Sequence, residues 1–372
     1  MTRRIPYIDL AAQHRPLRQE LLAAFAQVLD EGHFVLGDRV TQFETEFARR
    51  MGVKYAIGVN SGTDALILAL RALGIGPGDE VISAPNSFVA STAAIHLVGA
   101  RPVLVDVRED YNIDPSRVAA AVTPRTKAIL PVHLTGRPCD MDALGEIAER
   151  HGLHIVEDCA QAVLAAYRGR RVGSFGAIGC FSLHPLKTLN ACGDGGVLTT
   201  DDEALYQQLL LLRNIGLRTR EDCVLFSGNS RLDALQAALL MVKLPHLGEW
   251  TEARRENAAR YRQGLAGLAE VRVPDDPPEL YSVYHTVVIA APARDSLRDY
   301  LTSVGIGSAI HYPVPIHLTQ AGRTLGYELG SFPITERLAG EILSLPAYQG
   351  LLPEQVDDVC AAIRTFYKEV RR

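Results

Sequence analysis

Short apolar runs alternate with stretches of helical periodicity between residues 54 and 214, and this alternation constrains the fold of the 372-residue chain most. Strands that alternate with helices build a mostly parallel sheet with helices on both faces. In such sheets, ligands bind beyond the carboxyl ends of the strands. The predicted strands are 55–59, 80–84, 103–106, 128–132, 154–157, 178–182 and 196–199, and the helices that follow them are 64–73, 90–98, 114–121, 140–151 and 202–214.

A change of character near residue 250 predicts a second, smaller unit. A helix rich in Arg and Ala is expected over 252–268, and the prolines from Pro274 to Pro278 then signal a loop. Strands at 283–289 and 306–310 follow, with helices at 296–304, 335–344 and 353–370. We therefore predict a large α/β domain over residues 1–250, which includes N-terminal helices at 16–29 and 40–51, and a small α+β domain over 251–372.

Composition excludes several classes of protein. Hydrophobic residues make up 47% and charged residues 22%, which excludes disorder, collagen and a coiled coil. The net charge of -5 argues against a protein whose main task is to bind nucleic acid. The six cysteines form no CxxC pair, and no apolar run approaches the ~20 residues of a membrane span. We expect a cytoplasmic protein with neither a nucleic acid nor a membrane as partner.

A stretch of low charge from Cys180 to Val197 contains a lysine suited to Schiff-base chemistry. Lys187 follows a predicted strand, in a turn with His184, and the Gly193–Gly196 run leads into the next strand. Burial disfavours a charged lysine, and the neutral amine can attack a carbonyl carbon. A lysine taken alone is more often a solvated surface residue. The glycines either let a cofactor approach the backbone or only shape a tight turn.

A carboxylate stands at the carboxyl end of another predicted strand. Asp158 is costly to bury there without a partner. It either caps a helix or pairs with a buried cation, such as the protonated pyridine nitrogen of a cofactor. Glu157 alternates to the other side of the strand, where we expect a structural role.

The turn after the first strand offers a possible anion site. Ser61-Gly62-Thr63 precedes an apolar helix, whose first N–H groups and dipole favour a phosphate. The same residues also serve as ordinary helix caps, and the stretch matches neither the Walker pattern nor GxGxxG. Phosphate binding here therefore depends on the neighbouring signals.

Further stretches leave alternatives open or exclude a chemistry. Phe88 follows a strand end, where it could stack on an aromatic ring or fill the core. Residues 228–233 place several polar donors before a helix, where they either bind a ligand or cap the helix. His151 and His154 straddle a helix end and a strand start, so they share no ligand face and we predict no metal site. No Gly-x-Ser-x-Gly elbow is present, which argues against a Ser-His-Asp hydrolase.

Together these stretches resemble the DegT/DnrJ/EryC1/StrS family of sugar aminotransferases, over nearly the whole chain from Phe34 to about Leu318. The resemblance implies the fold-type I architecture of pyridoxal phosphate enzymes, a homodimer, and amination of keto sugars on nucleotide carriers. The segments that carry it are SGTDAL (61–66), PVHLTG (131–136), EDCAQA (157–162), FSLHPLK (181–187), GDGG (193–196) and NSRLDALQAA (229–238).

The resemblance also implies roles for individual residues. Lys187 matches the lysine that holds pyridoxal 5′-phosphate covalently, and Asp158 matches the partner of its pyridine nitrogen. Gln161 resembles the residue beside the phenolic oxygen, and Phe88 the aromatic that stacks on the ring. The remaining matches are Gly62, Thr63 and Ser182 for the phosphate cradle, Asn229 for the phosphate of the neighbouring subunit's cofactor, and His311, Tyr312 and His317 for the sugar nucleotide. His184, which we also expect to bind the substrate, departs from the family pattern, because many relatives have Tyr or Phe at its position.

These roles predict a transaminase of amino sugar biosynthesis. L-glutamate would supply the amino group, Lys187 would move the proton, and a dTDP-linked keto-6-deoxyhexose would accept the amino group at C4 or C3. Some relatives that remove a hydroxyl group carry His in place of the lysine, so Lys187 favours transamination. The alternatives are a UDP- or GDP-linked keto sugar or a keto-cyclitol as acceptor, a non-catalytic cofactor-binding regulatory protein, and a nicotinamide dehydrogenase, whose glycine fingerprint is absent.

Overall fold

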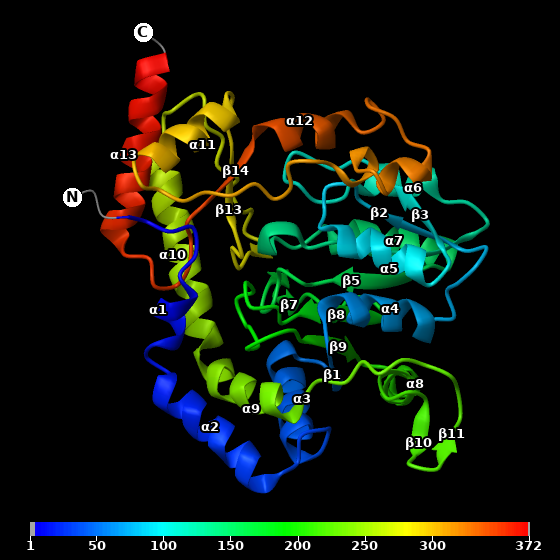
Figure 1. Ribbon diagram of the computed structural model, residues 1–372. Coiled ribbons are helices and arrows are strands. Elements are labelled where there is room, and N and C mark those ends of the chain that lie inside the picture. The colour runs from blue at the N-terminus through cyan, green and yellow to red at the C-terminus, as the bar shows by residue number, and fades with distance from the viewer. Residues whose placement is uncertain (1–3, 371–372) are drawn as a thin grey trace.

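The computed structural model describes residues 4–370, which form a seven-stranded sheet between helices and a mainly helical group beside it (Figure 1). The strand order is β1-β9-β8-β5-β4-β2-β3. Strand β9 is antiparallel to both of its neighbours, and the other neighbouring strands are parallel, which confirms the mostly parallel sheet. The strands are β1 (Tyr55–Val59), β2 (Glu80–Ser83), β3 (Arg101–Leu104), β4 (Thr126–Ile129), β5 (His154–Asp158), β8 (Ile178–Ser182) and β9 (Gly196–Thr200).

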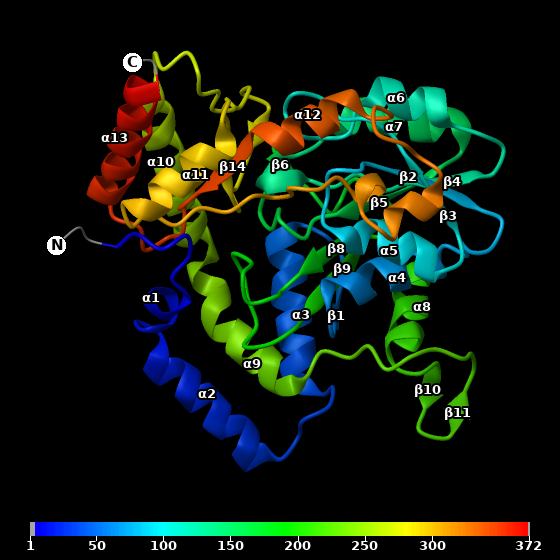
Figure 2. The ribbon, with the colours of Figure 1, turned by 45° about the horizontal axis from the view of Figure 1, so that its top comes forward.

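Capping side chains from the preceding loops set where several sheet-covering helices begin. Ser61 accepts a hydrogen bond from the Asp64 N–H at the start of α4, and Asp140 and Asp202 cap α7 and α8 in the same way. Figure 2 shows these helices lying against the sheet. The helices of this part are α1 (Leu10–His14), α2 (Arg18–Glu31), α3 (Asp38–Met51), α4 (Gly62–Ala72), α5 (Val89–Leu97), α6 (Pro115–Ala121), α7 (Met141–His151), α8 (Glu203–Arg213) and α9 (Ala234–Lys243).

The helical group is built mainly from the C-terminal third of the chain. The long helix α10 (Leu247–Leu265) packs beside α13 (Pro353–Val370), and the pair β13 (Val287–Ala290) and β14 (Ile342–Leu345) lies with them (Figure 1). Ile5 shares their apolar core and bridges to Ile306, so the N-terminal segment joins this group. The domain division at residue 250, which falls within α10, stays a prediction.

Two element predictions in this part are wrong. The strand expected at 306–310 forms only isolated bridges, from Ile306 to Ile5 and from Ala309 to Ser344. The helix expected at 335–344 is α12 (Pro333–Glu341), which ends before β14. All four β14 residues are buried and paired with β13, so tertiary burial outweighs their helical periodicity.

The remaining helix of the described residues is α11 (Arg294–Ser303). None of the described helices is both long and apolar enough to cross a bilayer.

Several short elements carry too few residues for a periodic signal in the sequence. The short strands are β6 (Ala166–Tyr167), β7 (Arg170–Arg171), β10 (Leu217–Thr219), β11 (Asp222–Cys223) and β12 (Leu280–Tyr281), and the 3-10 turns are Leu134–Gly136, Leu244–His246, Ile316–Leu318 and Gly322–Leu325.

Candidate active site

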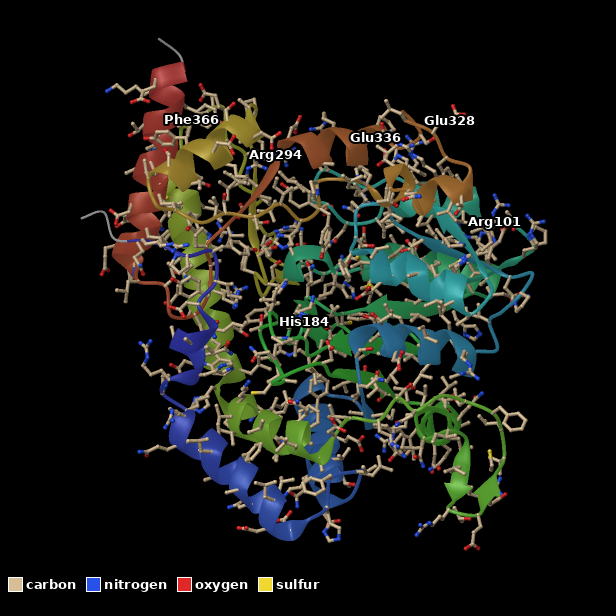
Figure 3. The ribbon with its side chains drawn as sticks, in the orientation of Figure 1. Arg101, His184, Arg294, Glu328, Glu336 and Phe366 are labelled. Atoms are coloured by element: carbon tan, nitrogen blue, oxygen red, sulfur yellow. The ribbon has the colours of Figure 1, made fainter. Side chains whose placement is uncertain are left out.

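A cavity of about 440 Å³ lies where the strand ends of the sheet meet α10 and the N-terminal segment. This is the edge at which parallel sheets bind ligands. In Figure 3, His184 marks the region, at the end of the sheet that faces α10. The predicted site residues that line the cavity are Gly62, Thr63, Phe88, Asp158, Gln161, Ser182, His184, Lys187, His311 and Tyr312.

Lys187 presents its amine to this cavity. The residue is half-buried by surface area, but its ammonium group is withdrawn from water, and desolvation lowers its pKa to about 8. The charge of Asp158 opposes this shift. The Lys187 N–H donates to the His184 carbonyl and the Lys187 carbonyl accepts from the Asn190 amide, which fixes the turn that carries the lysine. The lowered pKa therefore leaves a much larger fraction of neutral amine near physiological pH than an exposed lysine would have.

Asp158 ends strand β5 with only 4% of its surface exposed. Its two carboxylate oxygens accept from the Ser91 hydroxyl, at 2.7 Å, and from the Ala160 N–H, at 3.1 Å. Burial raises its pKa, because these neutral donors compensate only part of the desolvation. No helix begins here, so the helix-cap interpretation is wrong. A buried carboxylate at a cavity wall is suited to a cationic ligand atom.

The start of helix α4 approaches the end of β8 closely. A Cβ atom added to Gly62 would lie 2.6 Å from the Ser182 Cβ, so only glycine fits without movement. Ser61 caps the helix, and the first-turn N–H groups of Gly62 and Thr63 have no acceptor within the helix. With the positive end of the helix dipole at the cavity wall, this turn is suited to an anion.

An aromatic and amide group lines another part of the cavity. Gln161 accepts from the Thr135 N–H at 2.6 Å and donates to the Tyr312 hydroxyl at 3.3 Å. Burial raises the pKa of Tyr312 to about 12, so its hydroxyl stays protonated. Phe88 lies 5.7 Å from the Tyr312 ring and is 56% exposed, which excludes the core interpretation of this phenylalanine. Its ring is free to stack on a planar ligand.

Two predicted site residues lie outside this cavity. Asn229 is exposed in the loop before α9. His317 is fully buried, with its Nε2 2.9 Å from a Glu336 carboxylate oxygen. Their assigned roles stay predictions.

Sequence patterns missed several residues that line the cavity. Tyr7, Arg254 and His285 come from the N-terminal segment, from α10 and from the loop before β13, respectively. Ser91 lies one helical turn after Phe88, and its contact with Asp158 depends on the packing of α5 against α4 and the sheet. None of them belongs to a recognisable local motif, so no sequence signal marked them.

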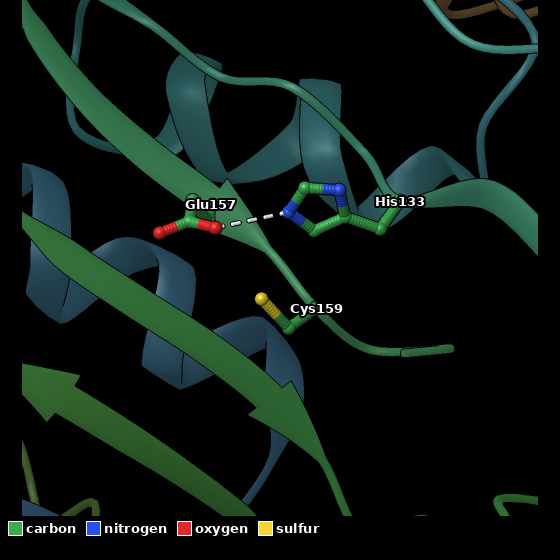
Figure 4. A group of neighbouring side chains, drawn as sticks. All are labelled: His133, Glu157 and Cys159. Atoms are coloured by element: carbon green, nitrogen blue, oxygen red, sulfur yellow. Dashed lines mark hydrogen bonds and ion pairs between the residues drawn. The ribbon is translucent and has the colours of Figure 1, made fainter. Parts of the chain in front are cut away.

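A buried polar group behind Asp158 was also missed (Figure 4). His133 accepts from the Cys139 N–H through Nδ1, so Nε2 carries the hydrogen that it donates to Glu157, at 3.1 Å. Glu157 also accepts three backbone N–H bonds, from Gly173, Phe175 and Gly176. This confirms its structural role. The grouping of His133, Glu157 and Cys159 has the residue types of a metal site, but protein donors already engage the His and Glu atoms.

Comparisons with known proteins agree with this geometry. A family model described as the DegT/DnrJ/EryC1/StrS aminotransferase family matches residues 16–364. The dTDP-3-amino-3,4,6-trideoxy-alpha-D-glucose transaminase of Streptomyces venezuelae is 46% identical over 99% of this chain and 98% of its own length. The UDP-N-acetyl-3-dehydro-alpha-D-glucosamine 3-aminotransferase of Acidithiobacillus ferrooxidans is 44% identical over 97% of each chain.

A solved structure gives the same result. The crystal structure of S. venezuelae DesV in complex with a ketimine intermediate superposes with a TM-score of 0.96 at 47% identity, and covers 98% of this chain and 99% of that one. With this agreement in sequence, architecture and site geometry, the chain belongs to the DegT/DnrJ/EryC1/StrS aminotransferase family.

Proposed function

We propose that the chain is a pyridoxal 5′-phosphate-dependent transaminase that moves the amino group of L-glutamate to C3 of a nucleotide-linked keto sugar. The observation that carries the proposal is one cavity with a lysine of lowered pKa and a buried aspartate of raised pKa in its wall. Both relatives described above carry 3-amino names, one on a dTDP and one on a UDP carrier, which favours C3 over C4. A dTDP-linked keto-6-deoxyhexose is our first choice of acceptor.

The cavity residues fit the cofactor at each of its functional groups. The Lys187 amine would hold the aldehyde carbon, Asp158 the pyridine nitrogen, and the N–H groups at the start of α4 the phosphate. The exposed ring of Phe88 would cover the pyridine ring. When bound, the cofactor supplies an electron sink for the substrate carbon.

The side chains of this protein would then orient and move protons. Lys187, with a pKa of about 8, is neutral often enough near pH 7.5 to take a proton from a substrate carbon and return it. Asp158 would keep the pyridine nitrogen protonated, and the Ser91 hydroxyl fixes the orientation of its carboxylate. The Gln161–Tyr312 pair would lie beside the phenolic oxygen of the cofactor.

A homodimer is part of the proposal. Asn229 lies in an exposed loop outside the cavity of its own chain, where its side chain, whose Oδ1 accepts from the Arg231 N–H at 3.4 Å, could reach a neighbouring subunit. Phe226, three residues earlier, is 93% exposed, and Ile215 and Val224 of the same segment are also exposed, so the segment presents an apolar surface that a partner subunit could cover. Light scattering of the purified protein at several concentrations tests this part alone.

An absorbance spectrum before and after L-glutamate tests the activity. The cofactor-loaded protein should show a visible band that L-glutamate removes and that one keto sugar nucleotide restores. A panel of dTDP-, UDP- and GDP-linked 3-keto and 4-keto sugars would identify the acceptor. Lys187→Ala, with an unchanged circular dichroism spectrum, should lose both changes. A coloured protein that does not respond to L-glutamate would refute the transaminase and support the regulatory alternative.

A further inference from the structure

We propose that Arg254 binds the α-carboxylate of the amino donor. The inference rests on the proposed function, because it requires a donor amino acid in the cavity that Lys187 lines. Arg254 lies on α10, and its contacts leave one side of a buried guanidinium open.

Arg254 is a buried cation in the cavity wall. It is 4% exposed, and within residues 4–370 no carboxylate lies within ion-pair distance of it. Burial lowers its pKa to about 10, so the group remains charged at neutral pH. The nearby Tyr7 hydroxyl does not neutralise it, because desolvation raises the pKa of Tyr7 above its ordinary value. An unpaired buried guanidinium is costly, which favours an anionic ligand.

The hydrogen bonds of Arg254 leave its carboxylate-binding edge partly free. Its Nη1 donates to the carbonyls of Tyr284 and His285, and its Nη2 to the Gln349 side-chain oxygen, at 3.2 Å. Its Nε is buried without a partner.

The free edge is the one that other arginines of this chain use for carboxylates. Arg49 binds Glu46, and Arg260 binds Asp357, through Nε and Nη2 together. The Nη1 contacts of Arg254 therefore orient the guanidinium, and the Nε side can receive a carboxylate in the same manner.

His285 connects this edge with Lys187. It lines the same cavity, and its Nδ1 is buried without a partner. Burial lowers the pKa of His285, and the charges of Lys187 and Arg254 lower it further. Both cationic groups thus act on one imidazole. In an α-amino acid, the carboxylate is one bond from the carbon whose proton Lys187 would take. A carboxylate on Arg254 would hold that carbon near Lys187, whereas the side-chain carboxylate of glutamate is three bonds from the same carbon.

The proposal can be tested on the unmodified, cofactor-loaded protein with two amides of glutamate. L-isoglutamine lacks the charge of the α-carboxylate, and L-glutamine lacks that of the side chain. Spectral titration gives the dissociation constant of each. We expect L-isoglutamine to bind about 100-fold more weakly than L-glutamate. Equal binding of isoglutamine and glutamate, or a loss confined to glutamine, would overturn the proposal without any variant.

Variants supply the second arm. Arg254→Gln should weaken L-glutamate and L-glutamine about 100-fold and leave L-isoglutamine within about threefold, and Arg254→Lys should recover part of the loss. Arg255→Gln is the matched control, because this neighbour on α10 faces Tyr281 and the Ser282 carbonyl and does not line the cavity. The dissociation constants of Arg255→Gln for the amino acids should equal those of the unmodified protein.

The outcomes separate this inference from the function on which it rests. If Arg254→Gln weakens only the keto sugar nucleotide, the guanidinium serves the acceptor and the inference is wrong, while the transaminase stands. If the wild type binds cofactor but no amino acid, the proposed function and this inference both fail.

Discussion

The close approach of α4 to β8 makes Gly62→Ala an informative perturbation. The added methyl group would meet the Ser182 Cβ at 2.6 Å and its Cα at 3.0 Å, and backbone cannot move aside as a flexible side chain would. Overpacking of this kind costs about 1–3 kcal/mol. Because Gly62 begins the helix whose N–H groups would hold the cofactor phosphate, we also expect the cofactor dissociation constant to rise at least tenfold.

Gly145→Ala is the matched control, with the opposite sign. Gly145 lies inside helix α7, and an added Cβ would meet nothing within 4 Å. Alanine in a helix interior stabilises by about 0.5–1 kcal/mol relative to glycine. Urea unfolding of the cofactor-free variants measures both changes, and fluorescence titration measures cofactor affinity. Adding Ser182→Gly to Gly62→Ala should restore part of the stability, since it removes the nearest clashing atom. A Gly62→Ala variant as stable as Gly145→Ala would refute the steric argument.

Three further predictions concern charges in and behind the cavity. The pKa of Lys187 is lower in the folded state than in the unfolded state, so below pH 8 the folded protein carries a desolvated charge. Lys187→Met should therefore stabilise the cofactor-free protein by about 3 kcal/mol at pH 7. In urea unfolding, this difference should shrink from pH 8 to 10.5 and be absent above pH 10.5. A constant difference across that range would contradict the shift. Asp158→Asn should slow the glutamate half-reaction at least about 100-fold, measured by stopped-flow absorbance. Ser91→Ala, which removes one hydrogen bond to Asp158, should slow it less. A near-normal rate for Asp158→Asn would contradict the role proposed for this carboxylate. Glu157→Gln should lower the free energy of unfolding by about 2–4 kcal/mol, measured by chemical unfolding. The carboxylate accepts from three backbone N–H groups and from His133, and the amide that replaces it brings N–H donors of its own. An unchanged unfolding midpoint would show that these hydrogen bonds contribute little to stability.

The residues predicted at strand ends were predictable because the sheet fixes their place. Asp158 ends β5, Gly62 follows β1, and Lys187 follows β8, and these strands end at one edge of one sheet. Periodicity located the strands, and the parallel topology then brought the three residues together without any knowledge of the loops. The same reasoning failed at β14, where a helix-like sequence is held extended by its pairing with β13.

No such rule predicts which residues form the opposite wall of the cavity. Tyr7, Arg254 and His285 are each more than 30 positions from the nearest other member and reach the cavity only when α10 and the N-terminal segment pack beside the sheet. Tyr7 stacks on His311, whose Nδ1 lies 2.9 Å from the Ser344 hydroxyl of β14, so this wall depends on contacts among three distant segments. Such contacts follow from packing and not from local pattern.

The two walls of the cavity would bind different ligands. The sheet-edge wall holds the lysine, the aspartate and the helix start, which suit the cofactor, and these are anchored by strand hydrogen bonds and a helix cap. The opposite wall holds the unpaired Arg254 and the neutral His285, which suit the carboxylate of a donor. Because α10 carries Arg254 and also packs on α13, movement of the helical group relative to the sheet would change the distance between Arg254 and Lys187 and leave the cofactor contacts intact. Substitutions in the core between α10 and α13 should therefore alter the KM for the amino donor before they alter the affinity for the cofactor.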